Sequence, residues 1–272
     1  MYSDVEEHVR YQIANAPIRE YPYPHIYVEN VFPDMFYKAL RAHWPEASRL
    51  RNLDVLGRVP EGAYPERFVM PLNSDEISRL GEEAREFWTA FSTWLLSQAF
   101  LEYLTHKFEA GIRCRFGPTL SQYSFSSESL VVRDNTNYTI GPHTDATHRL
   151  MSLLFYCPDD NRLQHLGTSI YRPKDQWFTC EGGLQYPRSW FHRVTTMNFR
   201  PNTLFAFLKT DNSFHGVERI EDDAVIRDLV LYDIRAEKSE QKAAQMNAPS
   251  GILGLGMLKR LFGIKQIPSK SD

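Results

Sequence analysis

The chain has 272 residues, of which 42% are hydrophobic and 13% aromatic, so it can form a packed core and is not an intrinsically disordered protein. Its formal net charge of -3 and pI near 6.3 exclude the strongly basic face that nucleic-acid binding needs. No window approaches the roughly 20 uninterrupted apolar residues of a transmembrane segment. We therefore expect a small-molecule or peptidyl substrate and no nucleic-acid partner.

The cysteines and the N-terminus predict the compartment. Cys114, Cys157 and Cys180 form no CxxC pair and no zinc-binding spacing, and so small and odd a number is typical of free thiols in a reducing compartment. The opening "MYSDVEEHVRYQ" is charged and lacks the apolar stretch of a secretory signal. These features predict a cytoplasmic protein.

The first seventy residues predict one helix between two irregular segments. Residues 1–30 contain several prolines and predict an extended arm or edge strand. In "PDMFYKALRAHWPEA" the apolar residues Phe36, Leu40 and Trp44 recur at helical spacing between two prolines, which predicts a short helix. Residues 49–73 show no clear period and predict a long loop that could act as a lid.

A long amphipathic helical stretch is expected next. Ser74 is a plausible helix start and Gly111 a plausible stop. The pattern predicts one long helix or two joined helices that back a sheet. Its apolar positions are Ile77, Leu80, Phe87, Phe91, Leu95, Phe100, Tyr103 and Leu104.

From Pro118 the pattern changes to short β-like runs separated by Gly, Pro, Asn and Asp, which predicts a sandwich or barrel of antiparallel strands. We expect a single domain over residues 1–235, with a helical part (1–117) and a β core (118–235). Residues 236–272 form a polar linker and an apolar tail. This tail is expected to dock on its own domain or to pair two copies as a homodimer.

The segment "GPHTDATH" carries the first candidate ligands. On an extended chain, His143 and Asp145 point to the same side, so imidazole and carboxylate can converge. An HxD pair alone arises often by chance. His215, at the start of a later β-like run, offers a third ligand. Two histidines and one carboxylate occupy one face of an octahedron and leave positions open, which suits non-haem Fe(II) oxygenases.

A basic group follows the distal histidine. Arg227 lies in "VIRDLVLYDI", and a guanidinium beside a metal site is suited to bind a carboxylate with two hydrogen bonds. The alternative is an ordinary strand arginine paired with Glu218 or Asp228. His148 is not expected to be a ligand, because its offset of five from His143 points it to the opposite side. We interpret Arg149 as a plain surface charge.

The motifs "HTD", "FHGV" and "IRDLVLYDIR" together resemble the Fe(II)- and 2-oxoglutarate-dependent dioxygenase superfamily. The resemblance covers about residues 118–235. It implies a double-stranded β-helix (a jelly roll, cupin-like) core buttressed by helices. It also implies that His143, Asp145 and His215 hold Fe(II) as the catalytic centre, and that Arg227 binds the 5-carboxylate of 2-oxoglutarate.

The resemblance further implies a hydroxylase that uses O2 and 2-oxoglutarate and releases succinate and CO2, with ascorbate as a supporting reductant. The chain departs from a common family pattern at Leu229, where many members have a serine that also touches the cosubstrate. Tyr138, on the strand leading into HxD, is expected to supply that hydrogen bond.

The sequence is also compatible with two other functions. One is a non-catalytic jelly-roll module that binds a metal or ligand, and the other is a cupin-type metalloenzyme that does not use 2-oxoglutarate. The substrate is not specified by any motif. Residues 49–73 and the loop 159–167 are the expected specificity elements, because function concentrates on loops over a rigid scaffold.

Overall fold

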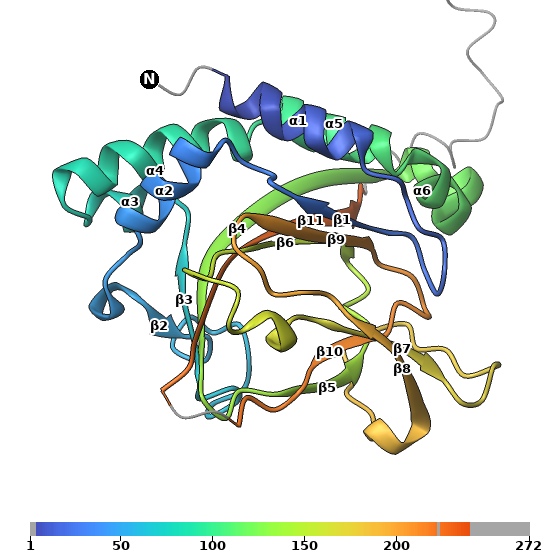
Figure 1. The fold of residues 1–272 in the computed structure, drawn as a ribbon. Coiled ribbons are helices and arrows are strands. Elements are labelled where there is room, and N and C mark those ends of the chain that lie inside the picture. Colours follow the sequence, from blue (N-terminus) through green and yellow to red (C-terminus); the bar gives the residue numbers. More distant parts are fainter. Residues whose placement is uncertain (1–3, 222–223, 240–272) are drawn as a thin grey trace, which may run out of the picture.

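The computed structural model describes residues 4–221 and 224–239. Its β-strands form two antiparallel sheets (Figure 1). The larger sheet has seven strands in the order β1-β9-β6-β11-β4-β3-β2, and the smaller has four in the order β5-β10-β7-β8. The strands are β1 His25–Glu29, β2 Arg51–Asn52, β3 Arg67–Pro71, β4 Tyr123–Asn135, β5 Ile140–His143, β6 Arg149–Tyr156, β7 Ser169–Pro173, β8 Phe191–Thr196, β9 Thr203–Leu208, β10 His215–Val217 and β11 Ile226–Lys238.

The two sheets face each other across a cavity that is lined from both, as in a double-stranded β-helix. The predicted fold class is thereby confirmed. Side chains alternate along β11: Val230, Tyr232 and Ile234 join the core beneath the helices, whereas Arg227 and Leu229 line the cavity. The period-2 pattern of the sequence thus separates an apolar outer face from an inner face that carries polar groups.

The helices cover the outer face of the larger sheet, on the side away from the smaller one (Figure 1). Their aromatic side chains reach the strands: Phe100 packs edge-on against Tyr232 with ring centroids 5.7 Å apart, and Phe32 stacks on Phe155 at 5.2 Å. No helix of the described residues is both long and apolar enough to cross a membrane. The helices are α1 Val5–Asn15, α2 Asp34–Ala42, α3 Ser74–Ser78, α4 Glu82–Leu95, α5 Gln98–Lys107 and α6 Glu109–Phe116, with 3-10 turns at Ala47–Arg49, Gly117–Gln122, Gln164–Leu166 and Arg188–Trp190.

The helical stretch differs from the expectation of one helix or two. It contains four helices, α3 to α6, because the chain is extended at Gly81 and at Ser97 and leaves helical geometry again at Phe108. Ser97 then caps α5 by accepting a hydrogen bond from the Phe100 N–H. Helical structure also runs past Gly111 to Phe116. Local capping overrides the continuous apolar period.

Two further expectations about the N-terminal half are wrong in part. Residues 1–30 include the helix α1 as well as the edge strand β1, which pairs with β9. The expected lid at 49–73 contains β2 and β3, and β3 pairs with β4 along its whole length. Residues 53–66 between them are loop. Residues 236–238 of the predicted linker belong to β11, and the rest of the linker and the tail, beyond Ser239, lies outside the described residues.

Candidate metal centre

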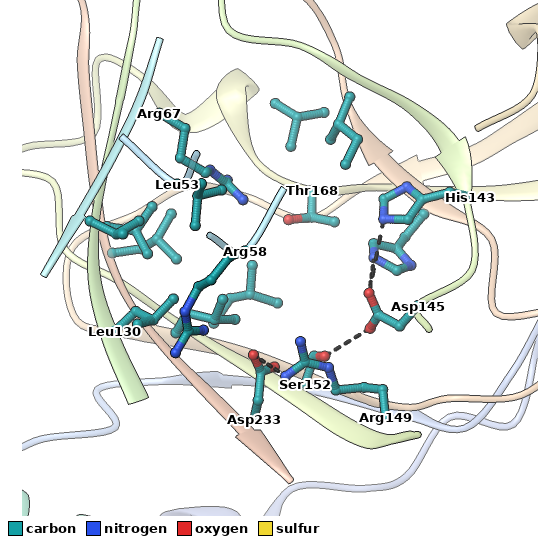
Figure 2. Close-up of a pocket in the computed structure, with 18 of the residues that line it drawn as sticks. Leu53, Arg58, Arg67, Leu130, His143, Asp145, Arg149, Ser152, Thr168 and Asp233 are labelled. Carbon is teal, nitrogen blue, oxygen red and sulfur yellow. Dashed lines mark hydrogen bonds and ion pairs between the residues drawn. The ribbon is translucent and has the colours of Figure 1, made fainter. Parts of the chain in front are cut away.

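The strand pairing brings the three predicted ligands together. His143 ends β5 and His215 begins β10, and the antiparallel register places them directly opposite each other, with ring centroids 4.3 Å apart. Asp145 follows β5 by two residues. Its Oδ1 lies 3.9 Å from Nε2 of His143 and 3.6 Å from Nε2 of His215. Figure 2 shows His143 and Asp145 on one side of the pocket.

Hydrogen bonds fix which atom each ligand offers. Nδ1 of His143 lies 2.9 Å from the Gly141 carbonyl, and Nδ1 of His215 lies 2.9 Å from the Ser213 carbonyl. A carbonyl only accepts, so both Nδ1 atoms donate and both Nε2 atoms keep a free lone pair. Three ligand atoms, one from each residue, lie within 4.8 Å of one another, a spacing that could hold a metal ion.

The protonation states also suit a cation. Burial, helped by the electrostatic interaction with His215, lowers the pKa of His143 to about 4. Burial raises the pKa of Asp145, but His215 and Arg149 outweigh it and lower that pKa to about 2. Ser152 donates to Asp145 Oδ2 at 2.8 Å, which leaves Oδ1 for the centre of the cluster. Near neutral pH, His143 and Asp145 are in the deprotonated forms that bind metals.

Gly216 sets the spacing of the two histidine-bearing strands. A Cβ built on it would lie 2.6 Å from the Ile140 carbonyl oxygen and 3.0 Å from that of Gly141, both backbone atoms of β5. Gly216→Ala is therefore expected to push β10 from β5 and separate His215 from His143. We expect a fall in Ni(II) affinity on the order of tenfold, as for other changes outside the ligand set, measured by calorimetry.

The control for this variant is Gly81→Ala, where a Cβ meets no atom within 4 Å and φ is not positive. It should keep its Ni(II) affinity. Equal affinities in the two variants would show that Gly216 does not set the distance between the two histidines.

Arg227 lies at the closed end of the cavity, which has a volume of about 550 Å³. Its side chain is fully buried; Nη1 donates to Asp134 Oδ2 at 2.6 Å and Nε to the Leu166 carbonyl at 2.7 Å. The alternative pairing with Glu218 or Asp228 is wrong, because Glu218 pairs with Arg188 and Asp228 faces the helices. Nη2 of Arg227 has no well-oriented hydrogen-bond partner among the described residues.

Tyr138 lies at the same end. Its hydroxyl is buried and without a hydrogen-bond partner among the described residues, and burial raises its pKa, so it keeps a proton to donate. The structure also adds Arg67 of β3, which binds both oxygens of Asp134, at 2.6 and 2.9 Å, and stacks over the Tyr138 ring at 4.3 Å. The alternating pattern of "RFVMP", with Val69 also turned inward, is the signal in the sequence that points to Arg67.

The other end of the cavity is open and charged. Arg149 is not the surface charge that the sequence suggested: it forms an ion pair with Asp233 and lines the pocket (Figure 2). The register of β6 against β11 shifts beside Leu150, which turns Arg149 to the inner face. Burial raises the pKa of Asp233 to about 6, with Arg149 opposing it. His148 lies at the exposed rim of the pocket, outside the cluster of three ligands.

No family model matches this chain, and no curated protein matches it. Similar solved structures include a prolyl-4-hydroxylase of Pseudomonas putida (13% identity, 85% of this chain and 98% of that one, TM-score 0.43) and prolyl 4-hydroxylases of Phytophthora capsici (12%, 90% and 74%, 0.47). Another is SnoN, a non-haem α-ketoglutarate-dependent epimerase of nogalamycin biosynthesis (15%, 97% and 92%, 0.43). These values assign no activity, so function is inferred from the site itself.

Proposed function

We propose that this protein is an Fe(II)- and 2-oxoglutarate-dependent oxygenase that hydroxylates a small-molecule or peptidyl substrate and releases succinate and CO2. The observation that carries the proposal is the charge imbalance at the closed end of the cavity. There two guanidinium groups, of Arg67 and Arg227, share one carboxylate, that of Asp134. A buried net positive charge of this kind needs an anion.

The buried atoms without a hydrogen-bond partner indicate which kind of anion would bind. Nη2 of Arg227 and the hydroxyl of Tyr138 are both donors, so a carboxylate that accepts from both would satisfy them. Arg67 lies within electrostatic range of His143, since its charge contributes to lowering the His143 pKa. A dicarboxylate that reaches from the metal centre to Arg227 would therefore fit the cavity.

The residues then have distinct tasks. His143, Asp145 and His215 would hold the metal, which supplies the activation of O2 and of 2-oxoglutarate when bound. Arg227 and Tyr138 would orient the distal carboxylate, and Asp134 and Arg67 would hold Arg227 in place. Apolar side chains line the cavity between its two ends and exclude water there; they are Leu130, Val132, Leu154 and Leu229.

The experiment is calorimetric titration of the Ni(II)-loaded protein with 2-oxoglutarate, followed by an assay for succinate with Fe(II), O2 and ascorbate. We expect 2-oxoglutarate to bind and succinate to form, slowly without substrate. Metal binding without 2-oxoglutarate binding would instead indicate a cupin-type metalloenzyme. Binding of both without any succinate over a broad substrate panel would indicate a non-catalytic module.

Tyr138→Phe separates a binding role from a structural one. Removing a buried hydroxyl that has no partner should leave the melting temperature unchanged or slightly raised. The affinity for 2-oxoglutarate should fall about threefold to tenfold, the value of one hydrogen bond, while Ni(II) affinity stays. Tyr37→Phe serves as a control outside the cavity, because its hydroxyl donates to the Pro158 carbonyl at 2.6 Å and its loss should reduce stability but not 2-oxoglutarate affinity. Unchanged 2-oxoglutarate affinity in Tyr138→Phe would remove Tyr138 from the site.

A further inference from the structure

The open end of the cavity carries a second polar cluster. Asp233 lies on the same face of β11 as Arg227, six residues on, which is roughly 20 Å along the strand. The Arg227 side chain is fully buried, whereas at the open end Arg58 and Arg235 are 31% and 34% exposed. A substrate therefore reaches the metal centre from the Asp233 end, and the cosubstrate end is closed behind it.

Not every group in this cluster needs a ligand. Arg58 and Arg235 both bind Glu128, with nitrogen-to-oxygen distances of 2.9 Å and 2.6 Å, so that carboxylate is satisfied within the protein. Asp233 differs. Its side chain is 3% exposed and pairs with Arg149 through Oδ2, but its Oδ1 has no well-oriented hydrogen-bond partner among the described residues. The Nε of Arg149 is likewise buried and unpartnered.

The two ends of the cavity are therefore suited to different ligands. The closed end offers only donors, from Arg227 and Tyr138, whereas the open end offers one acceptor, Asp233, beside one donor, Arg149. A purely cationic ligand would face the guanidinium groups of this end, and a purely anionic ligand would leave Asp233 Oδ1 unpaired. A ligand with both charges side by side satisfies both residues.

The residues around this cluster further restrict the kind of ligand that would bind. Ser152, which binds Asp145, lies on β6 with Arg149, so the cluster directly adjoins the metal centre (Figure 2). The wall beside it is apolar, from Leu130, Leu154 and Leu231. A charged head group at Asp233 would leave an apolar side chain along this wall, within the same cavity as the metal ligands.

We infer that the open end binds the head group of a free α-amino acid with an apolar side chain, with its ammonium group donating to Asp233 and its carboxylate accepting from Arg149. This inference rests on the proposed oxygenase function, because it makes the amino acid the substrate presented to the metal. Asp233 and Arg149 are then the residues that determine specificity.

The test is titration of the Ni(II)-loaded protein, with and without 2-oxoglutarate, with L-leucine, L-methionine and L-phenylalanine, read by calorimetry and by ligand-observed NMR. At least one should bind, and its N-acetyl and its carboxamide forms should each bind at least about tenfold more weakly, as loss of a charge-assisted hydrogen bond predicts. If the blocked forms bind equally well, a peptidyl segment is the ligand and the inference is overturned. It is also overturned if 2-oxoglutarate binds but none of the amino acids does.

Failure of the proposed function would give a different pattern of binding results. If 2-oxoglutarate does not bind while the free amino acids still bind more tightly than their blocked forms, the oxygenase proposal fails and the amino-acid subsite stands. If neither 2-oxoglutarate nor any amino acid binds, both fail. The two titrations are measured on the same protein sample, so the results can be assigned separately.

Two variants test the assigned contacts. Asp233→Asn should abolish the preference for a free over an acetylated amino group, and Arg149→Met the preference for a carboxylate over an amide, with an unchanged circular dichroism spectrum in both as evidence of folding. Asp228→Asn is the matched control, a buried aspartate of the same strand that faces the helices and binds Arg133 and Arg41. This variant should prefer the free amino acid over its N-acetyl and carboxamide forms as the wild type does. Wild-type discrimination by Asp233→Asn would overturn the assignment of the ammonium group.

Discussion

Alanine at His143, Asp145 or His215 is expected to lower the affinity for Ni(II) or Mn(II) by on the order of 100-fold or more, the largest effect predicted for this protein. Each residue supplies one of three ligand atoms within 4.8 Å of one another, so its loss leaves two. Changes to residues around a metal's ligands already reduce affinity about 10- to 100-fold, and removal of a ligand should exceed that. Calorimetric titration of the purified variants measures the effect.

His148→Ala is the control, because that histidine follows His143 by five residues yet lies at the exposed rim. It should bind metal as the wild type does. Full affinity in Asp145→Ala, or a loss in His148→Ala as large as in His143→Ala, would disprove the ligand assignment. Circular dichroism of each variant shows whether it is folded.

Arg227→Gln is expected to weaken 2-oxoglutarate binding about 10- to 100-fold, while Ni(II) affinity is kept. Charged hydrogen bonds contribute about 1.5–3 kcal/mol each, and Arg227 is the fully buried guanidinium with an unfilled donor. The variant also leaves Asp134 with only Arg67, so we expect some loss of stability as well.

Arg133→Gln controls for that loss of stability. Arg133 lies on the neighbouring strand β4 and binds both oxygens of Asp228, at 2.8 and 2.9 Å, on the face toward the helices. Its removal leaves Asp228 with Arg41, much as removal of Arg227 leaves Asp134 with Arg67. Both variants should melt earlier, but only Arg227→Gln should bind 2-oxoglutarate weakly. Equal 2-oxoglutarate affinities in the two variants would mean that Arg227 is a structural residue.

The main elements of the site could be predicted because they follow local rules. His143 and Asp145 point to one side since residues two apart on an extended chain share a face. Arg227 was predicted from its place on the strand that follows His215, and the structure turns it to the inner face of β11 together with Leu229. The helix over residues 34–42 is predicted by the spacing of Phe36 and Leu40.

Residues that depend on distant strands could not be predicted in this way. Arg67 and Arg227 meet at Asp134 only because β3 and β11 flank β4, a pairing with no local signal. Arg149 turns inward because of a register shift that no propensity marks. The breaks at Gly81 and Ser97 were hidden by an apolar period that runs across both.

The sequence by itself predicted the fold class, the three residues that converge at the candidate metal centre and the arginine behind them, because residues two apart on a strand share a face and because the motifs that carry these residues resemble those of a known family. Only the tertiary structure decided which charges remain unbalanced. It left two guanidinium groups on one carboxylate at the closed end of the cavity, and an unpaired acceptor beside an unpaired donor at the open end. The physical reason is that a buried polar atom needs a ligand only when no protein group within hydrogen-bond reach satisfies it. Here the groups within reach come from strands that are far apart in the chain.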